Sequence, residues 1–214
     1  MIDCIIKLGG AAITVKDQIE TLQPDTIAAV ADLISRLRTF GKSVIIVHGA
    51  GSFGHQHAAA AGLGKTEHRL ASPDEVAAGV AATRLALLKL HQAVLSELIS
   101  KNVPAVGLSP LAMGFSSSKS VEGSMFSTIP RLLSRRLVPV LHGDVVLDNS
   151  TKTRFSIFGG DVIMAQLWRE FEPQFAVFLV SHISSCTSIY TRNHKQNQPQ
   201  KLRCALILNK RRRM

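Results

Sequence analysis

Short apolar runs of strand length alternate with helix-like segments through most of this 214-residue chain. An unbroken apolar run of about 4–8 residues is typical of a β-strand that is buried on both faces. The predicted strands cover residues 2–8, 43–48, 104–108, 137–141 and 175–180, with a hairpin from 145–147 and 154–158. The predicted helices cover residues 25–39, 73–101, 129–136 and 161–171. This alternation predicts an α/β protein, a three-layer α/β/α sandwich with a mainly parallel sheet.

Two of the predicted helices carry their own start or stop signals. Pro24 precedes residues 25–39 at a first-turn position, and Gly41 follows them as a glycine suited to end a helix. Ser72 and Glu75 have the spacing of a capping box, with Pro73 at the first helical position. The long helix that follows carries apolar residues along one stripe, so we expect it to pack lengthwise against the sheet.

Glycine-rich motifs follow four of the predicted strands. Parallel strands end at one edge of a sheet, and ligands bind at that edge. Glycine allows the backbone to approach a phosphate closely, and its amide donates hydrogen bonds to phosphate oxygens. Carboxylates beside such turns orient the cations that phosphoryl transfer requires. The motifs are Lys7-Leu8-Gly9-Gly10, Gly49-Ala50-Gly51-Ser52-Phe53-Gly54-His55, His142-Gly143-Asp144 and Gly159-Gly160-Asp161.

Taken singly, each of these motifs has low specificity. Gly9-Gly10 fits an ordinary turn, and Asp161 fits a helix N-cap equally well. Residues 49–54 have the spacing of a dinucleotide-binding loop, but no acidic residue closes a strand about 20 residues later, and no P-loop lysine follows. His55 stands directly after this segment at a strand end, which favours a functional role over a structural one.

In combination the motifs are more specific. KLGGAAITVK, VHGAGSFGH, LHGDVVLD and IFGGDVIM, in this order and spacing, resemble the amino acid kinase family over residues 2–180. The histidine that ends the second motif is similar to that of the isopentenyl phosphate kinase branch. The resemblance implies phosphorylation of isopentenyl phosphate to isopentenyl diphosphate by direct in-line transfer from ATP, with Mg²⁺.

The resemblance also implies roles for residues near the phosphates. Lys7 would contact the transferred phosphoryl group, and Lys16 is similar to the family's second lysine there. The phosphate loop for ATP would be lined by Gly9, Gly10 and Ala11.

Further roles follow for the acceptor side. His55, when protonated, would hydrogen-bond the acceptor phosphate, and Gly160 would lie against the substrate. Asp161 would orient the lysines, so the expected catalytic set is Lys7, Lys16, His55 and Asp161. Ala50, Gly51 and Gly54 would shape the junction between acceptor and nucleotide. No residue is expected to ligate a metal directly, and the role of Asp144 stays open.

The isoprenoid tail of the acceptor needs an apolar slot, and the long helix after Pro73 is the expected wall. Val76, Ala77, Val80 and Ala81 suit such a wall by size and polarity, although the stripe also fits an ordinary core.

The pattern changes after residue 180. The remaining residues are polar and without period, and they carry eight lysines and arginines but no acidic residue. They account for most of the net charge of +10, since the first 181 residues hold 17 basic against 15 acidic side chains. We therefore expect a kinase-like domain over 1–180 and a basic, disordered tail over 181–214, and we expect no nucleic-acid binding. Because the family places adenine and ribose in segments after this point, the nucleotide part is expected to be incomplete.

Two other functions stay open at this stage. One is a catalytically inactive isoform that acts as a binding or regulatory protein, and the other is a kinase for another small phosphate or phosphonate acceptor.

The scattered cysteines Cys4, Cys186 and Cys204 fit a reducing compartment, and no membrane-spanning run is present in the sequence, so we expect a cytoplasmic protein. The resemblance adds a homodimer as a candidate assembly.

Overall fold

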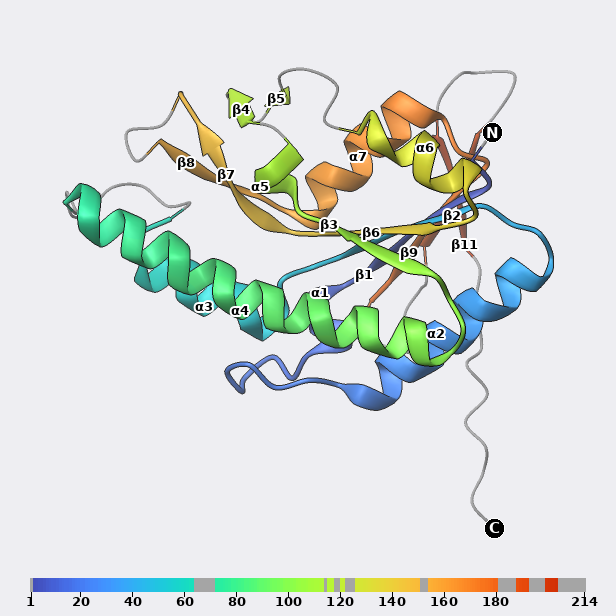
Figure 1. The fold of residues 1–214 in the computed structure, drawn as a ribbon, viewed down its shortest axis with the longest axis horizontal. Coiled ribbons are helices and arrows are strands. Elements are labelled where there is room, and N and C mark those ends of the chain that lie inside the picture. Colours follow the sequence, from blue (N-terminus) through green and yellow to red (C-terminus); the bar gives the residue numbers. More distant parts are fainter. Residues whose placement is uncertain are drawn as a thin grey trace, which may run out of the picture.

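A seven-stranded sheet forms the middle layer of the computed structural model (Figure 1). The structure describes residues 2–63, 72–113, 115–117, 120–121, 126–150, 154–180, 188–192 and 199–203. The strand order is β11-β10-β9-β1-β2-β6-β3, and the five strands from β9 to β3 are parallel. The strands are β1 (Cys4–Leu8), β2 (Val44–His48), β3 (Ala105–Leu108), β6 (Val138–His142), β9 (Phe175–Leu179), β10 (Ser188–Arg192) and β11 (Pro199–Arg203).

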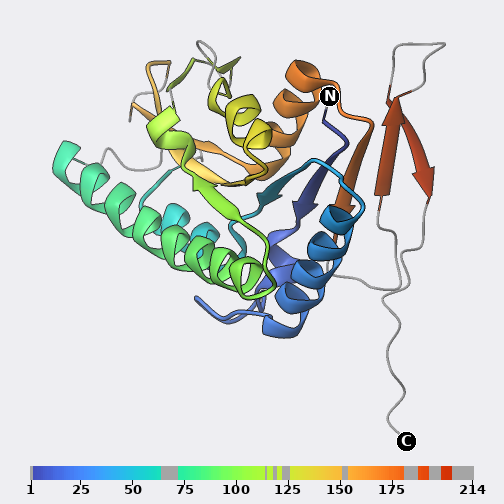
Figure 2. The ribbon, with the colours of Figure 1, turned by 45° about the vertical axis from the view of Figure 1, so that its right-hand side comes forward.

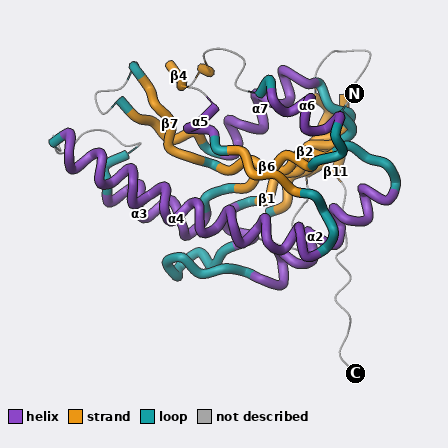
Figure 3. Tube along the Cα trace, viewed as in Figure 1, coloured by secondary structure: helices purple, strands orange, loops and turns teal. Residues whose placement is uncertain are grey.

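Helices cover both faces of this sheet, which confirms the predicted three-layer sandwich (Figures 1 and 3). One face carries α1 (Gly10–Ile13), α2 (Pro24–Thr39), α3 (Gly51–Ala60) and α4 (Pro73–Ser100). The other carries α6 (Thr128–Ser134) and α7 (Gly160–Phe171). A smaller sheet of order β5-β4-β7-β8 lies beyond α5 (Pro110–Met113). It consists of β4 (Phe115–Ser117), β5 (Ser120–Val121), β7 (Asp144–Asp148) and β8 (Phe155–Phe158), and the predicted β7–β8 hairpin is present.

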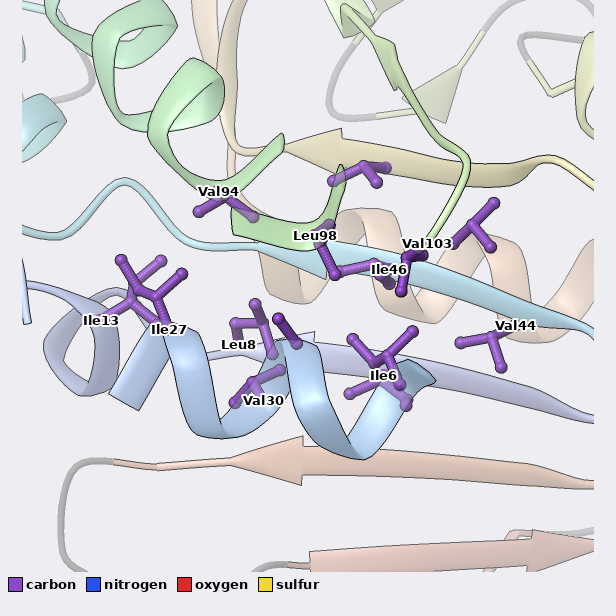
Figure 4. Packing of buried hydrophobic residues seen from close by; sticks show 14 of the residues in the cluster. Ile6, Leu8, Ile13, Ile27, Val30, Val44, Ile46, Val94, Leu98 and Val103 are labelled. Atoms are coloured by element: carbon purple, nitrogen blue, oxygen red, sulfur yellow. The ribbon is translucent and has the colours of Figure 1, made fainter. Parts of the chain in front are cut away.

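The two cores follow from the period of two in the buried strands. Ile6 of β1 and Ile46 of β2 point to the α2 and α4 face, where Figure 4 shows them packed among helix side chains. Ile5 and Ile45, their neighbours in sequence, point to the α7 face instead. Because both faces are covered, β1, β2 and β6 are apolar along most of their length, as the sequence indicated. The same alternation decides which face each polar residue near a strand end reaches.

Two features differ from the sequence prediction. The glycine-rich motif over residues 49–55 was not predicted to be helical, but residues 51–60 form the helix α3. Residues 181–214 were expected to form a disordered tail with few long-range contacts, and this is wrong for β10, which pairs antiparallel with β9 and with β11 (Figure 2). Isoleucine, tyrosine and threonine in β10 favour a strand, and β9 offers an edge for it. The rest of the predicted tail lies outside the described residues, and the division at 180 stays a prediction.

The predicted capping box of α4 is confirmed in full. Ser72 accepts a hydrogen bond from the backbone amide of Glu75 at 3.2 Å, and the Glu75 side chain accepts one from the Ser72 amide at 2.8 Å.

Within the described part of the chain, no helix combines the length and the apolar character that crossing a bilayer requires.

We therefore predict that Ser72→Ala lowers the free energy of unfolding by about 1 kcal/mol, since it leaves the first-turn amide of α4 without its cap. Urea denaturation followed by circular dichroism measures this change. Ser96→Ala, on the exposed side of the same helix, is the matched control and should not destabilise the protein. Equal effects of the two substitutions would show that the cap contributes nothing specific.

Candidate active site

A cavity of about 1230 Å³ lies where the turns after β1, β2 and β6 meet. Its walls come from segments that are far apart in sequence, and they include nearly all of the predicted site residues. These are Lys7, Gly10, Ala11, Lys16, Ala50, Gly51, Gly54, His55, Gly160 and Asp161. The structure therefore gathers the four sequence motifs at one cavity.

Gly9 is the exception among the predicted site residues. It does not line the cavity, and its amide donates a hydrogen bond to the Leu179 carbonyl at 2.8 Å. A Cβ at Gly9 would stand 2.8 Å from that same oxygen. The glycine therefore allows β1 to pack closely beside β9, and the expectation that its amide faces a phosphate is corrected.

Close backbone contacts join the turns after β1 and β2. A Cβ on Gly10 would lie 2.3 Å from the Gly51 nitrogen, and one on Gly49 would lie 2.7 Å from the Gly10 nitrogen. Gly51 has φ +51°, a conformation that other residues rarely adopt. The hydroxyl of Thr14, a residue that the sequence analysis missed, donates to the Gly10 carbonyl and accepts from the Ser52 amide. The starts of α1 and α3 are thus fixed side by side.

Lys7 and Asp161 form an ion pair inside this cavity. The Lys7 Nζ lies 2.5 Å from Asp161 Oδ1, and the lysine side chain is only 14% exposed. Strand alternation explains the pairing, because Lys7 shares with Ile5 the sheet face that α7 covers. The N-cap of α7 is Gly159, and no side chain caps this helix. The interpretation of Asp161 as an ordinary N-cap is therefore wrong.

Lys16 and His55 lie on the exposed side of the cavity. The loop that carries Lys16 is closed at its base by a bridge between Thr14 and Leu22. Glu20 holds the far side of this loop, because it accepts from Lys89 of α4 at 2.7 Å and pairs with His57 of α3 at 2.9 Å. The hydrogen bond from Lys89 is the main cause that lowers the pKa of Glu20.

Comparison with known proteins decides the family. The family model described as "Amino acid kinase family" matches residues 4–197. The chain belongs to the amino acid kinase family. A similar curated protein is the isopentenyl phosphate kinase of Arabidopsis thaliana, 31% identical over 92% of this chain and 68% of that protein. The isopentenyl phosphate kinase of Methanothermobacter thermautotrophicus is 32% identical over 92% and 73%.

Solved structures agree with this assignment. A structure described as isopentenyl phosphate kinase superposes with a TM-score of 0.78 at 30% identity, covering 92% of this chain and 79% of that one. The product complex of the T. acidophilum isopentenyl phosphate kinase gives a TM-score of 0.72 at 25% identity, covering 91% and 75%. The amino acid kinase fold is thus confirmed, and family and relatives together indicate a phosphotransferase.

Asp144, whose role the sequence left open, has a structural role in the fold. Its carboxylate is buried and accepts hydrogen bonds from Arg84 at 3.0 and 3.3 Å and from the Ser109 hydroxyl at 3.1 Å. The backbone amides of Leu111 and Val145 also donate hydrogen bonds to this carboxylate. Asp144 therefore joins α4, α5 and β7, and its oxygens are occupied within the fold.

The residues of α4 that line the cavity are not the ones predicted to form its apolar wall. Val76 and Val80 are buried in a small cluster with Ala58, Leu63 and Val145, as the alternative of an ordinary core allowed. Ala77 and Ala81 face solvent. Two other residues of the same helix, Thr83 and Leu87, line the cavity, together with Leu63, Phe155 and Ile157. The stripe was identified correctly, but the part of it that meets the cavity was not.

Three histidines form a buried cluster beneath the glycine turns. His48 and His142 end β2 and β6, and His91 comes from α4. Their ring centroids lie 4.5–5.7 Å apart. Burial, more than any other cause, lowers the pKa of all three rings, that of His91 to about 3. This cluster was not predicted from the sequence, although the repeated His-Gly pair at two strand ends was a visible signal.

We predict that the histidine cluster makes the folded protein sensitive to acid. Below pH ~6.5 the rings charge in the unfolded chain, whereas burial opposes their protonation in the folded one, so the free energy of unfolding falls with pH. A ring that stays neutral in the folded protein lowers it by about 1.4 kcal/mol per pH unit. For His91 this loss continues from about pH 6.5 down to its folded pKa of about 3.

Urea denaturation of the protein and of His91→Gln between pH 6.5 and 4.5 measures this effect, because other titrating groups cancel in the difference. The free energy of unfolding should fall less steeply for the variant. Identical slopes would mean that His91 is not buried as a neutral ring.

Proposed function

We propose that this protein transfers the γ-phosphoryl group of ATP to isopentenyl phosphate, giving isopentenyl diphosphate and ADP. The observation that carries the proposal is the composition of the cavity. It combines Lys7 and Lys16, the exposed His55, closely packed glycine turns and an apolar wall. The names of the similar kinases support the same substrate.

The acceptor side suits a monophosphate that bears an apolar tail. A phosphate monoester is already anionic, so its attacking oxygen needs no general base. It needs a donor that holds the phosphate, and His55 with the first amides of α3 would supply one. Leu63, Leu87 and Phe155 would enclose the tail, since they form apolar wall in the same cavity.

The donor side suits the phosphates of ATP. In the transfer, the bond from the γ-phosphorus to the β,γ-bridging oxygen breaks, and a bond to an oxygen of the acceptor phosphate forms in line with it. Lys7 and Lys16 would stabilise the negative charge on the moving group, while Asp161 holds Lys7 in place. Gly10 and Ala11, at the start of α1, line the cavity without a bulky side chain and fit a phosphate loop.

Mg²⁺ is proposed to arrive with the nucleotide. Among the described residues no group of three or more His, Cys, Asp or Glu side chains is arranged to hold a metal ion. The proposal rests on the chemistry of Mg²⁺, which usually keeps several waters and binds through substrate phosphates. When bound, Mg²⁺ neutralises phosphate charge.

Cytoplasmic location and homodimer formation stay predictions, and size-exclusion chromatography with light scattering tests homodimer formation.

We predict that His55→Ala lowers kcat/KM for isopentenyl phosphate at least roughly tenfold, because a charge-assisted hydrogen bond contributes about 1.5–3 kcal/mol. Lys7→Ala should be more damaging, since it removes a cation from the transferred group itself. The control is Lys42→Ala, which removes a cation that pairs with Asp3 and does not line the cavity.

A coupled assay for ADP, run with isopentenyl phosphate and with a panel of other phosphates and phosphonates, measures these effects. Preference for another acceptor would replace the proposed substrate. Binding of isopentenyl phosphate without turnover, seen by calorimetry, would favour a binding or regulatory protein. Near-wild-type turnover by His55→Ala would assign that histidine a structural role.

A further inference from the structure

Two identical dipeptides end neighbouring strands beneath the cavity. His48-Gly49 follows β2 and His142-Gly143 follows β6, and the two histidines are directly opposite one another in the parallel ladder. Strand alternation directs both rings to the α4 side, where both residues are 0% exposed. None of the catalytic roles proposed above uses these side chains.

The hydrogen bonds of these rings fix their tautomers. His48 Nδ1 lies 3.1 Å from the Gly49 carbonyl, and His142 Nδ1 lies 3.0 Å from the Gly143 carbonyl. A carbonyl oxygen only accepts, so each Nδ1 carries the proton and donates. His48 Nε2 is then an acceptor, and it faces His91 Nδ1 at 2.9 Å, which donates to it.

These contacts orient the peptide bond after Gly49. Because His48 is buried, the Gly49 carbonyl oxygen that it binds is turned toward the core. In a planar trans peptide the next N–H points in the opposite direction, which directs the Ala50 amide away from the core and toward the cavity that Ala50 lines. A reversed peptide, which glycine tolerates, would present an oxygen to a bound anion.

We propose that His48 and His142 are positioning residues, each donating its Nδ1 proton to hold the carbonyl of the following glycine out of the phosphate cavity. The proposal rests on the function proposed above as far as catalysis is concerned, but the orientation of the peptides does not depend on it.

The surroundings of the two glycines explain why their orientation matters. Gly49 packs against the Gly10 nitrogen, at the start of α1, as the built Cβ distance of 2.7 Å shows. Gly143 packs against the Gly160 nitrogen, at the start of α7, with a corresponding distance of 3.3 Å. Each His-Gly pair therefore supports a helix start that lines the cavity. Burial lowers the pKa of both rings, which keeps them in the neutral form.

Paired amide substitutions separate the two nitrogens of each ring. In His48→Asn the side-chain amide occupies the place of Nδ1 and can still donate to Gly49, whereas in His48→Gln it reaches the place of Nε2 and cannot. We expect kcat/KM to be roughly tenfold higher in His48→Asn than in His48→Gln, with most of the difference in KM. His142→Asn and His142→Gln repeat the comparison. They lose no hydrogen bond at Nε2, which has no hydrogen-bond partner among the described residues and lies 3.9 Å from Asp144 Oδ2.

A readout without ligand separates this inference from the proposed function. The carbonyl ¹³C chemical shifts of Gly49 and Gly143 report whether each oxygen accepts a hydrogen bond. They should match the wild type in the asparagine variants and move in the glutamine variants. Unchanged shifts in both glutamine variants, or equal kcat/KM for asparagine and glutamine at both positions, would overturn the positioning role. Shifts that move as expected in a protein that phosphorylates no acceptor would uphold the peptide orientation and reject the kinase function.

Discussion

The absence of side chains where Gly10, Gly49 and Gly51 meet is the constraint on which the site depends. Backbone atoms of the turns after β1 and β2 approach so closely that a Cβ on Gly10 would stand 2.3 Å from the Gly51 nitrogen. This contact lets α1 and α3 begin at adjacent points, and helix starts are where backbone amides are free to bind anions. Lys7 and His55 reach one cavity because the segments that carry them are joined there.

Alternation along the buried strands then separates charged from neutral chemistry. Lys7, in phase with Ile5, reaches Asp161 on the α7 side. His48, in phase with Ile46, reaches His91 on the α4 side, where its surroundings keep it neutral. A shift of β1 or β2 by one residue would exchange these faces, so the register of the sheet also sets the chemistry of the cavity.

Local signals in the sequence were enough for most of the fold. Unbroken apolar runs identified the five parallel strands, and the Ser72 capping box identified the start of α4. The helix α3 was missed because its glycines favour a loop, whereas Gly54 in fact makes room for Leu87 of the neighbouring helix. The contact between Arg84 and Asp144 was not predicted from the sequence, because 60 residues separate them and only the packed fold brings them together.

Neutral groups beneath the glycine turns make the geometry of the site independent of pH near neutrality. A phosphate monoester loses its second proton near pH ~6, so an acceptor of this kind changes between one and two negative charges in the physiological range. The pKa of His91 lies at about 3, and that of His48 is also lowered by burial. The hydrogen bond from His91 to His48 therefore persists while the acceptor titrates. It follows that the acid limb of a rate profile would not reflect His48 or His91, because burial holds the pKa of both rings well below the ordinary value.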